Sequence, residues 1–253
     1  MGPGAGMNVL RIEHLQKSFG SLVVTDDFNL VLAQGERHVI IGPNGAGKTS
    51  LINQIGGQLR PGSGRILVKD QDITGSPPSR ISRMGVARTF QRNNVFQNLS
   101  VIENLRLALE VRLGNPLGFF TPVGRNERLR ERAHELLAQV HLGKDATRMA
   151  GRLSYGEQRQ LEIGIALAGD PELLLLDEPT SGMSPAETAR MIELIGALPR
   201  TLSILMIEHD MQVVFSVADR ITVLYYGRML ASGTPMDIRA NERVREVYLG
   251  VAH

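Results

Sequence analysis

The residues best suited to chemistry stand in one stretch where an apolar run gives way to a glycine-rich turn. The stretch reads Gly42-Pro43-Asn44-Gly45-Ala46-Gly47-Lys48-Thr49, followed by Ser50. Glycines at this spacing let successive backbone N–H groups turn toward phosphate oxygens, and a helix N-terminus behind them adds partial positive charge. Lys48 would then reach the β- and γ-phosphates, while the Thr49 hydroxyl would hold Mg²⁺. The pattern predicts a nucleotide-phosphate site over residues 42–50.

Two carboxylates form a second candidate group, directly after the apolar run Leu173–Leu176. Asp177 and Glu178 would lie at the carboxyl end of a buried parallel strand, where α/β sheets bind their ligands. Asp177 is the candidate Mg²⁺ ligand. Glu178 is the candidate general base that polarises the attacking water beside the γ-phosphate. The competing interpretation is a polar strand end that only caps the next helix.

Strands and helices must position these groups, and their order along the chain indicates the fold class. The unalternated apolar runs 173–176 and 203–207 are typical of strands buried on both faces of a parallel sheet. Helical periodicity dominates from about residue 91 to residue 168, including a predicted irregular loop at 113–126. A helical segment between strands predicts a subdomain inserted into an α/β core. Further strand signals lie at 9–12, 28–32, 39–41, 65–68 and 86–90, and residues 221–225 and 228–231 predict a hairpin around Gly227.

Composition narrows the class of protein. The chain has 253 residues, a formal net charge of +2, 4% aromatic residues and no cysteine. Near-balanced charge and few aromatics argue against a nucleic-acid partner, and the lack of cysteine excludes disulfides and thiolate metal sites. No apolar run approaches the length of a membrane span, and the N-terminus lacks a signal-peptide pattern. We therefore expect a soluble, cytosolic protein whose residues 1–6 form a flexible leader.

A third motif, Leu153-Ser154-Tyr155-Gly156-Glu157, has two interpretations. Ser154 and Glu157 fit an ordinary capping box ahead of an amphipathic helix. A helix N-terminus with a serine hydroxyl and a glycine that permits close approach is also an anion site. Taken in order, the phosphate loop, Gln91, LSYGE, LLLLDEP, SGMSP and His209 resemble the ATP-binding subunit of an ABC transporter, from about Met7 to the end of the chain.

That resemblance implies a fold and an assembly. The fold would be α/β, with a P-loop (RecA-like) nucleotide-binding core, an antiparallel β subdomain and an inserted α-helical subdomain. Residues 7–253 would form one ABC ATPase domain, with its core at 7–90 and 169–253 and its helical subdomain at about 91–168. Two subunits would close head to tail over ATP and Mg²⁺. Ser154 and Gly156 would then contact the γ-phosphate bound by the other subunit.

The resemblance also assigns roles to three residues that spacing alone leaves open. Gln91 would reach Mg²⁺ and the attacking water and link the site to the helical subdomain. His209 would be the switch histidine that contacts the γ-phosphate. Phe19 would stack on the adenine ring, although a single surface aromatic under a hairpin is an alternative on sequence grounds. The sequence departs from the family pattern in LSYGE, where LSGGQ is commoner, and at Ser184, where many members have Asp, so the contributions of these positions stay open.

The resemblance implies partners as well. Separate transmembrane permease subunits would convert closure into transport, with a substrate-binding protein acting indirectly, and the chain would work at the cytoplasmic face of the membrane. Phe96 is a candidate permease contact, or else packs inside the helical subdomain. SGMSP, the insert near residues 119–122 and the ending at 247–250 look like ATPases for branched-chain amino acid import. Urea or amide import and lipid or lipopolysaccharide transport are the alternatives, and the second ATPase subunit could be identical or only homologous.

Overall fold

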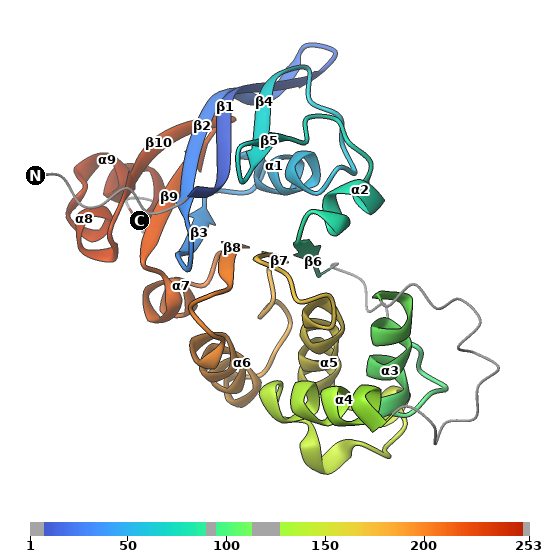
Figure 1. Cartoon of the computed structure of the whole chain (residues 1–253). Helices are drawn as coiled ribbons and strands as arrows, with labels where there is room; N and C mark the ends of the chain where they lie inside the picture. The colour runs from blue at the N-terminus through green and yellow to red at the C-terminus, as the bar shows by residue number, and fades with distance from the viewer. Residues whose placement is uncertain (1–7, 90–94, 113–126, 250–253) are drawn as a thin grey trace, which may run out of the picture. The chain divides into compact units, whose positions relative to one another are not determined.

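The computed structural model describes residues 8–89, 95–112 and 127–249. The predicted leader at 1–6, Gln91 and the predicted loop at 113–126 lie outside these residues. The chain divides into two compact units (Figure 1). The first contains residues up to 88, residues 172–178 and those from 199 onward; the second contains residues 89–171 and 179–198. The predicted boundaries differ at residues 179–198, which the prediction assigns to the core.

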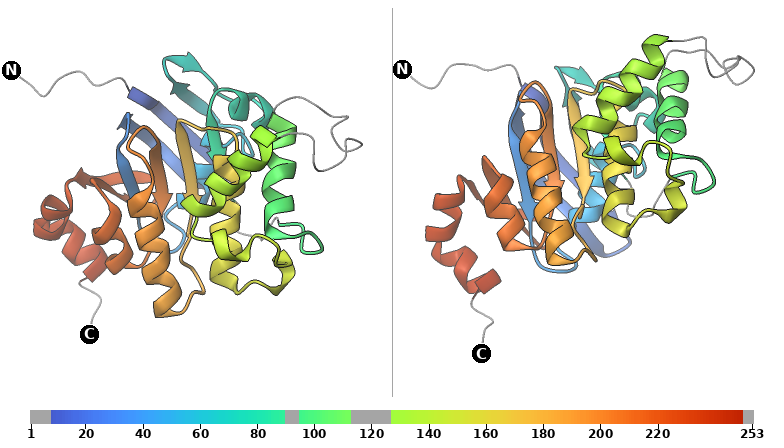
Figure 2. Two further views of the ribbon diagram at one scale, coloured as in Figure 1. Left: turned by 60° about the horizontal axis from the view of Figure 1, so that its bottom comes forward. Right: turned by 90° about the horizontal axis from the view of Figure 1, so that it is seen from below.

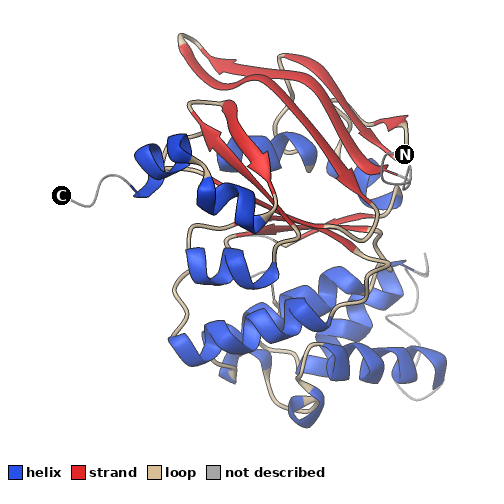
Figure 3. Cartoon of the chain, turned by 90° about the vertical axis from the view of Figure 1, so that its left-hand side faces the viewer, coloured by secondary structure: helices blue, strands red, loops and turns tan. Residues whose placement is uncertain are grey.

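Two sheets build the first unit, visible as separate groups of red strands in Figure 3. The antiparallel sheet has the order β2-β1-β4-β5, formed by β1 (Asn8–Phe19), β2 (Leu22–Ala33), β4 (Ser63–Val68) and β5 (Gln71–Asp72). The second sheet has the order β10-β9-β3-β8-β7-β6. Its strands are β3 (Arg37–Ile41), β6 (Val86–Arg88), β7 (Leu173–Asp177), β8 (Ser203–Ile207), β9 (Arg220–Tyr225) and β10 (Arg228–Gly233).

The six-stranded sheet is parallel except at one edge. Strands β9, β3, β8, β7 and β6 run parallel, and β10 pairs antiparallel with β9. The predicted hairpin around Gly227 is present, since Tyr225 pairs with Arg228. Every residue of β7 and β8 is buried, which explains why their sequences do not alternate. The predicted α/β fold, with a parallel core sheet and an antiparallel β subdomain, is confirmed.

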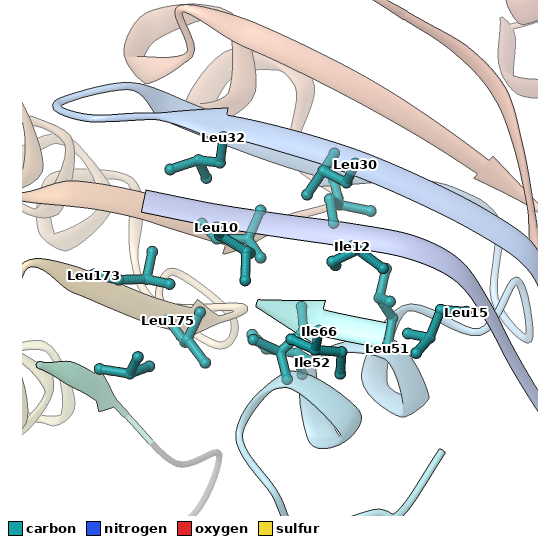
Figure 4. Packing of buried hydrophobic residues seen from close by; sticks show 14 of the residues in the cluster. Leu10, Ile12, Leu15, Leu30, Leu32, Leu51, Ile52, Ile66, Leu173 and Leu175 are labelled. Carbon is teal, nitrogen blue, oxygen red and sulfur yellow. The ribbon is translucent and has the colours of Figure 1, made fainter. Parts of the chain in front are cut away.

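Helices complete the first unit. They are α1 (Lys48–Ile55), α2 (Pro78–Arg83), α7 (Met211–Val217), α8 (Pro235–Ala240) and α9 (Glu242–Val244), followed by a short π-helix at Arg245–Leu249. Both α8 and α9 contact β10. In Figure 2 these helices are the red ones near the C-terminus. Helix α1 joins the apolar core, because Leu51 and Ile52 lie in one cluster with side chains from both sheets (Figure 4). This cluster fixes the helix that begins at Lys48 against the sheet that ends at the phosphate loop.

The second unit is helical in its described residues. It contains α3 (Val101–Arg112), α4 (Glu127–Gln139), α5 (Tyr155–Leu167) and α6 (Pro185–Ala197), with short 3-10 turns at Gly143–Asp145 and Ala150–Arg152. Helices α3, α4 and α5 contact one another, and α6 packs against α5. Capping boxes begin both α5 and α6, at Ser154 and Ser184. These two helix starts decide the geometry of the LSYGE motif.

Candidate nucleotide-binding site

The phosphate loop connects β3 to α1 in a conformation that requires glycine. Gly45 and Gly47 have φ angles of 80° and 102°, in the left-handed region that favours glycine. A Cβ atom on Gly47 would lie 2.1 Å from the carbonyl oxygen of Val24. Gly47 also precedes the first residue of α1, which has no capping side chain and no acidic residue in its first turn. Nothing negatively charged within this turn therefore competes with an anion for the helix N-terminus.

Lys48 is buried and its side chain folds back over the loop. Its Nζ atom donates to the carbonyl oxygens of Gly42 and Pro43, at 2.7 and 3.0 Å. Burial lowers the pKa of Lys48, while the nearby carboxylates of Glu178 and Asp177 oppose that shift. The ammonium is thus held within the loop and in the field of both predicted carboxylates. Thr49 and Ser50 follow it in the first turn of α1.

Strand register explains why these groups meet although they are far apart in sequence. Ile40 of β3 pairs with Ile207 of β8, and Ile207 pairs with Asp177 of β7. Beyond these pairs, the N–H of Glu178 donates to the carbonyl oxygen of Ile207 at 3.0 Å. The N–H of Glu208 donates to the carbonyl oxygen of Ile40 at 3.3 Å. The three strands therefore end together at the edge of the sheet where the phosphate loop begins.

Asp177 lies at the bottom of this edge and is almost fully buried. Its Oδ2 atom accepts a hydrogen bond from Nη2 of Arg88 at 3.2 Å, and the Arg88 side chain is only 9% exposed. Burial raises the pKa of Asp177, Arg88 opposes that rise, and the charge of Glu178 adds to it. The Oδ1 atom is buried and accepts no hydrogen bond from the described residues. Asp177 therefore has one oxygen without a hydrogen-bond donor, and additional positive charge nearby would stabilise its carboxylate.

A Mg²⁺ ion fits these features. A carboxylate oxygen without a donor is the hard ligand that Mg²⁺ prefers, and the ion would supply the missing charge. The described residues contain no group of three or more His, Cys, Asp or Glu side chains that could cage a metal. That is typical of Mg²⁺ sites, in which water and substrate phosphates provide most ligands. Asp177 and the Thr49 hydroxyl are the described candidates for its protein ligands, and Gln91 lies outside the described residues.

Glu178 and His209 lie next to one another beyond the ends of β7 and β8. Glu178 has a φ angle of 48°, which is unusual for a residue with a side chain and is often found at functional sites. Nδ1 of His209 lies 3.9 Å from Oε1 of Glu178 and 3.8 Å from Oε2 of Glu208. Glu208 is fully buried, and its carboxylate accepts the His209 backbone N–H at 3.0 Å. Glu208 thus fixes the backbone at His209, whose ring stays half exposed.

Phe19 ends β1 at the tip of the β1–β2 hairpin. It pairs with Leu22, and its ring is 51% exposed, with Nζ of Lys17 at 5.2 Å from the ring centroid. Two residues after Leu22 comes Val24, whose carbonyl oxygen approaches Gly47. The hairpin therefore holds an exposed aromatic ring at the same end of the unit as the phosphate loop. About half of Phe19 is thus exposed, and its stacking on adenine stays a prediction.

The LSYGE motif lies in the second unit, at the N-terminus of α5. The predicted capping box is present: Ser154 Oγ accepts the Glu157 N–H at 3.3 Å, and the Glu157 carboxylate accepts the Ser154 N–H at 2.7 Å. Tyr155 is 40% exposed, and its hydroxyl accepts a hydrogen bond from Arg159 at 3.0 Å. Ser154 and Gly156 also donate to a side chain from α6, Glu187. The motif is thus a capped helix start that already binds a carboxylate.

The structure brings the phosphate loop, Asp177, Glu178, His209 and Phe19 into one unit, whereas Ser154 and Gly156 belong to the other. Three contributors were missed in the sequence: Arg88, Glu208 and the second role of Glu187. Glu208 could have been found, because a charged residue directly after a buried strand and before His209 lies at the ligand edge of the sheet. Arg88 carries no such signal.

Comparison with known proteins shows which family the chain resembles. Residues 25–181 match the model for the ABC transporter family, and residues 228–253 match the model for branched-chain amino acid ATP-binding cassette transporters. The chain is 41% identical to the high-affinity branched-chain amino acid transport ATP-binding protein LivG of Escherichia coli K12, covering 96% of this chain and 98% of LivG. It is 34% identical to the lipopolysaccharide export system ATP-binding protein LptB of Haemophilus influenzae, with 96% and 98% of the two chains covered.

Solved structures agree with the sequence relatives. The ADP conformation of an ATP-binding cassette of an ABC transporter superimposes with a TM-score of 0.83, at 29% identity, over 96% of this chain and 99% of that one. Among the described residues, no helix has the length and apolar character needed to cross a bilayer; cassettes of this family act with transmembrane subunits. The chain belongs to the ABC transporter family, as an ATP-binding subunit of the branched-chain amino acid group that couples ATP hydrolysis to transport.

Proposed function

We propose that this chain hydrolyses Mg²⁺-ATP with Glu178 as general base, on a nucleotide held by the loop at residues 42–50. The observation that carries the proposal is the edge of the parallel sheet, where pairing brings the ends of β3, β7 and β8 together and so places Asp177 and Glu178 beside the start of the phosphate loop. When bound, Mg²⁺ supplies charge that stabilises the phosphate oxygens. Asp177 and Thr49 would hold the ion, and Lys48, which donates to the loop carbonyls in this structure, would donate to the β- and γ-phosphates.

Glu178 and His209 act at the γ-phosphate. Glu178 is partly exposed and stands one residue beyond the buried strand, so water can reach it, and its carboxylate accepts the proton of the attacking water. The His209 side chain contacts the γ-phosphate, and the buried Glu208 fixes the His209 backbone. Gln91, which lies outside the described residues, would reach Mg²⁺ and the attacking water. Phe19 stacks on the adenine, which is consistent with its exposed ring at the hairpin tip.

Two subunits close head to tail over the nucleotide. In this arrangement Ser154 and Gly156 donate to the γ-phosphate held by the partner's loop, from the N-terminus of a 13-residue helix. The γ-phosphate then joins the two subunits, and its loss on hydrolysis removes the reason for closure. The partner is a second copy or a homologous chain.

The transported solutes are branched-chain amino acids, and the chain works at the cytoplasmic face of the membrane against separate permease subunits, with a substrate-binding protein acting indirectly. Similarity to LivG and the match at residues 228–253 support this substrate class. Phe96 is the proposed permease contact. Its ring is 57% exposed, while its backbone is fixed by Asn104, which accepts its N–H at 2.8 Å and donates to its carbonyl at 3.1 Å.

The central experiment is Glu178→Gln. We expect ATP turnover to fall by about 10²-fold or more, because general-base catalysis contributes on that scale. ATP binding should persist, and an ATP-dependent dimer should accumulate and appear as a mass shift in light scattering. The control is Glu172→Gln, at the opposite end of β7, where Glu172 pairs with Lys69; it should hydrolyse ATP normally. Normal turnover in Glu178→Gln would exclude the general-base role.

A second candidate substrate class is lipid, because LptB is similar over the same length. Purifying the tagged chain with its bound membrane proteins from native membranes separates the two. Recovery of permease subunits that support leucine, isoleucine or valine uptake supports the first class. Recovery of lipid-handling partners contradicts it.

A further inference from the structure

One acidic side chain occupies the anion-binding end of α5. Glu187 belongs to the first turn of α6, where it completes the capping box of Ser184. Its Oε2 atom accepts hydrogen bonds from the Ser184 N–H at 3.0 Å and from the Ser184 hydroxyl at 2.8 Å. Its Oε1 atom turns to the other helix, where it accepts from Ser154 Oγ at 3.0 Å and from the Gly156 N–H at 3.1 Å. One carboxylate thus bridges the starts of two helices.

The two donors that Oε1 uses, Ser154 Oγ and the Gly156 N–H, belong to the two residues that the proposed function assigns to the partner's γ-phosphate. The fit is close, since a Cβ atom on Gly156 would lie 2.9 Å from Oε1 and 2.9 Å from Cγ of Glu187. The phosphate-loop helix α1 differs, because it has neither a capping side chain nor an acid in its first turn. The proposed function assigns the N-termini of α1 and α5 to phosphate. No side chain caps the N-terminus of α1, whereas the N-terminus of α5 binds the Glu187 carboxylate.

Glu187 is an anion at neutral pH. The hydrogen bonds from Ser184, and then those from Ser154 and Gly156, lower the pKa of Glu187 from 4.5 to about 2. No ion pair of Glu187 with a basic side chain occurs among the described residues, so its charge is stabilised by hydrogen-bond donors and by solvent. A carboxylate and a phosphate oxygen that accept from the same donors exclude each other by size and repel by charge.

We propose that the Glu187 carboxylate occupies, in the separate subunit, the place of the γ-phosphate of the partner's ATP, and that closure requires its displacement. Glu187 is thereby an internal competitor that raises the ATP concentration needed to form the dimer. This inference rests on the proposed role of Ser154 and Gly156 across the dimer. The capping contacts to Ser184 lie on the other carboxylate oxygen, Oε2.

The test uses the dimer that Glu178→Gln accumulates. Adding Glu187→Gln keeps the size of the side chain and removes its charge. We expect the ATP concentration for half-maximal dimerisation, measured by light scattering, to fall about tenfold, as for the loss of one charge-assisted contact. ATP binding to the monomer, measured at concentrations too low for dimerisation, should stay unchanged. A dimerisation midpoint that stays constant or rises overturns the inference.

The matched control is Asp237→Asn in the same background. Asp237 plays the equivalent capping part at α8, where its carboxylate accepts from the Thr234 N–H at 2.8 Å and the Thr234 hydroxyl at 2.7 Å. Asp237 belongs to the first unit and the LSYGE motif to the second, so neutralising Asp237 should leave the dimerisation midpoint in place. An equal shift in both variants would assign the effect to helix capping and would overturn the inference.

The contact itself is tested without a dimer. Titration of the Glu187 carboxyl by NMR should give a pKa of about 2, and Ser154→Ala should raise it. A Glu187 pKa near its ordinary value of 4.5 overturns the inference and leaves the proposed function intact. A low pKa of Glu187 could also be found together with no ATP-dependent dimer, whether or not Glu187→Gln is added to Glu178→Gln. That result would refute the head-to-tail closure of the proposed function, and with it the competition between Glu187 and the γ-phosphate.

Discussion

Replacing Arg88 by methionine should destabilise the chain by about 3–5 kcal/mol in the absence of nucleotide, the usual cost of breaking a buried ion pair. The magnitude follows from burial: the side chains of Arg88 and Asp177 are only 9% and 1% exposed. Methionine keeps apolar bulk but removes the cation that donates a hydrogen bond to the buried Asp177 carboxylate, so that Lys48 is the remaining cation with an effect on it. It also removes the hydrogen bond from Nη1 of Arg88 to Oε1 of Gln58, at 2.7 Å. Solvent cannot screen so deeply buried a charge.

The loss should depend on pH in a definite direction. Burial already raises the pKa of Asp177 above 3.8, and removing Arg88 raises it further. An acid whose pKa is higher in the folded state contributes stability below its unfolded pKa, and loses it as pH rises through the folded pKa. The difference between wild type and Arg88→Met should therefore be largest at neutral pH and shrink as pH falls toward about 4.

Urea unfolding followed by circular dichroism measures the effect, since the chain has no tryptophan. Unfolding should be compared with ATP plus Mg²⁺ and with ATP plus a chelator. Bound Mg²⁺ supplies positive charge at Asp177, so the deficit of Arg88→Met should be smaller with Mg²⁺ than with the chelator. The control is Arg83→Met, an exposed arginine of α2 that bonds to the Ser79 carbonyl in its own helix, with an expected change within about 0.5 kcal/mol.

A double substitution sharpens the reasoning. Arg88→Met with Asp177→Leu removes both charges and should be more stable than Arg88→Met alone, because no uncompensated buried charge remains. Our account of the site would be wrong if Arg88→Met lost less than about 1 kcal/mol at neutral pH. It would also be wrong if the loss were independent of pH and of Mg²⁺.

Two further predictions concern nucleotide binding and are measured by titrating the chain with a fluorescent ATP analogue. Gly47→Ala should abolish ATP binding, because its Cβ atom would lie 2.1 Å from the Val24 carbonyl oxygen. The control is Gly45→Ala, whose Cβ atom would lie in open space, and this variant should bind ATP more tightly than Gly47→Ala. An equal loss of ATP affinity in both variants would contradict the steric argument. Phe19→Ala should weaken binding about fivefold to a hundredfold, as for loss of one base–aromatic stack, whereas Phe19→Tyr should retain it and Leu22→Ala on the same hairpin should have no effect.

Buried strands and helix caps were the features that sequence could predict. The runs at 173–176 and 203–207 are apolar throughout because both faces of β7 and β8 are covered, and short unalternated runs of this kind are typical of such strands. The helix start at Ser184 could also be predicted, because the capping serine, Pro185 and Glu187 at N3 lie within four residues. Local chemistry decides such features, so local sequence contains them.

Tertiary context decided what the sequence could not show. Helix α7 (Met211–Val217) contains three valines in seven residues and resembles a strand, yet it is a helix whose three valines are all buried in the folded chain. Arg88 lay in a predicted strand, where nothing local indicated that β6 and β7 would bury it beside Asp177. The second use of Glu187 depends on the packing of α5 against α6, whose capping residues Ser154 and Ser184 are thirty positions apart.

The pairing of β3 has a consequence for the order in which this protein can form during synthesis. Both neighbours of β3, β8 and β9, come from residues 203–225, more than 160 positions later in the chain. Until the ribosome has released them, the strand that leads into Gly42 has no partners in its sheet, whereas α3, α4 and α5 can pack among themselves. A chain halted at residue 200 should therefore retain helical structure and fail to bind ATP. ATP retention by such a fragment would contradict this order.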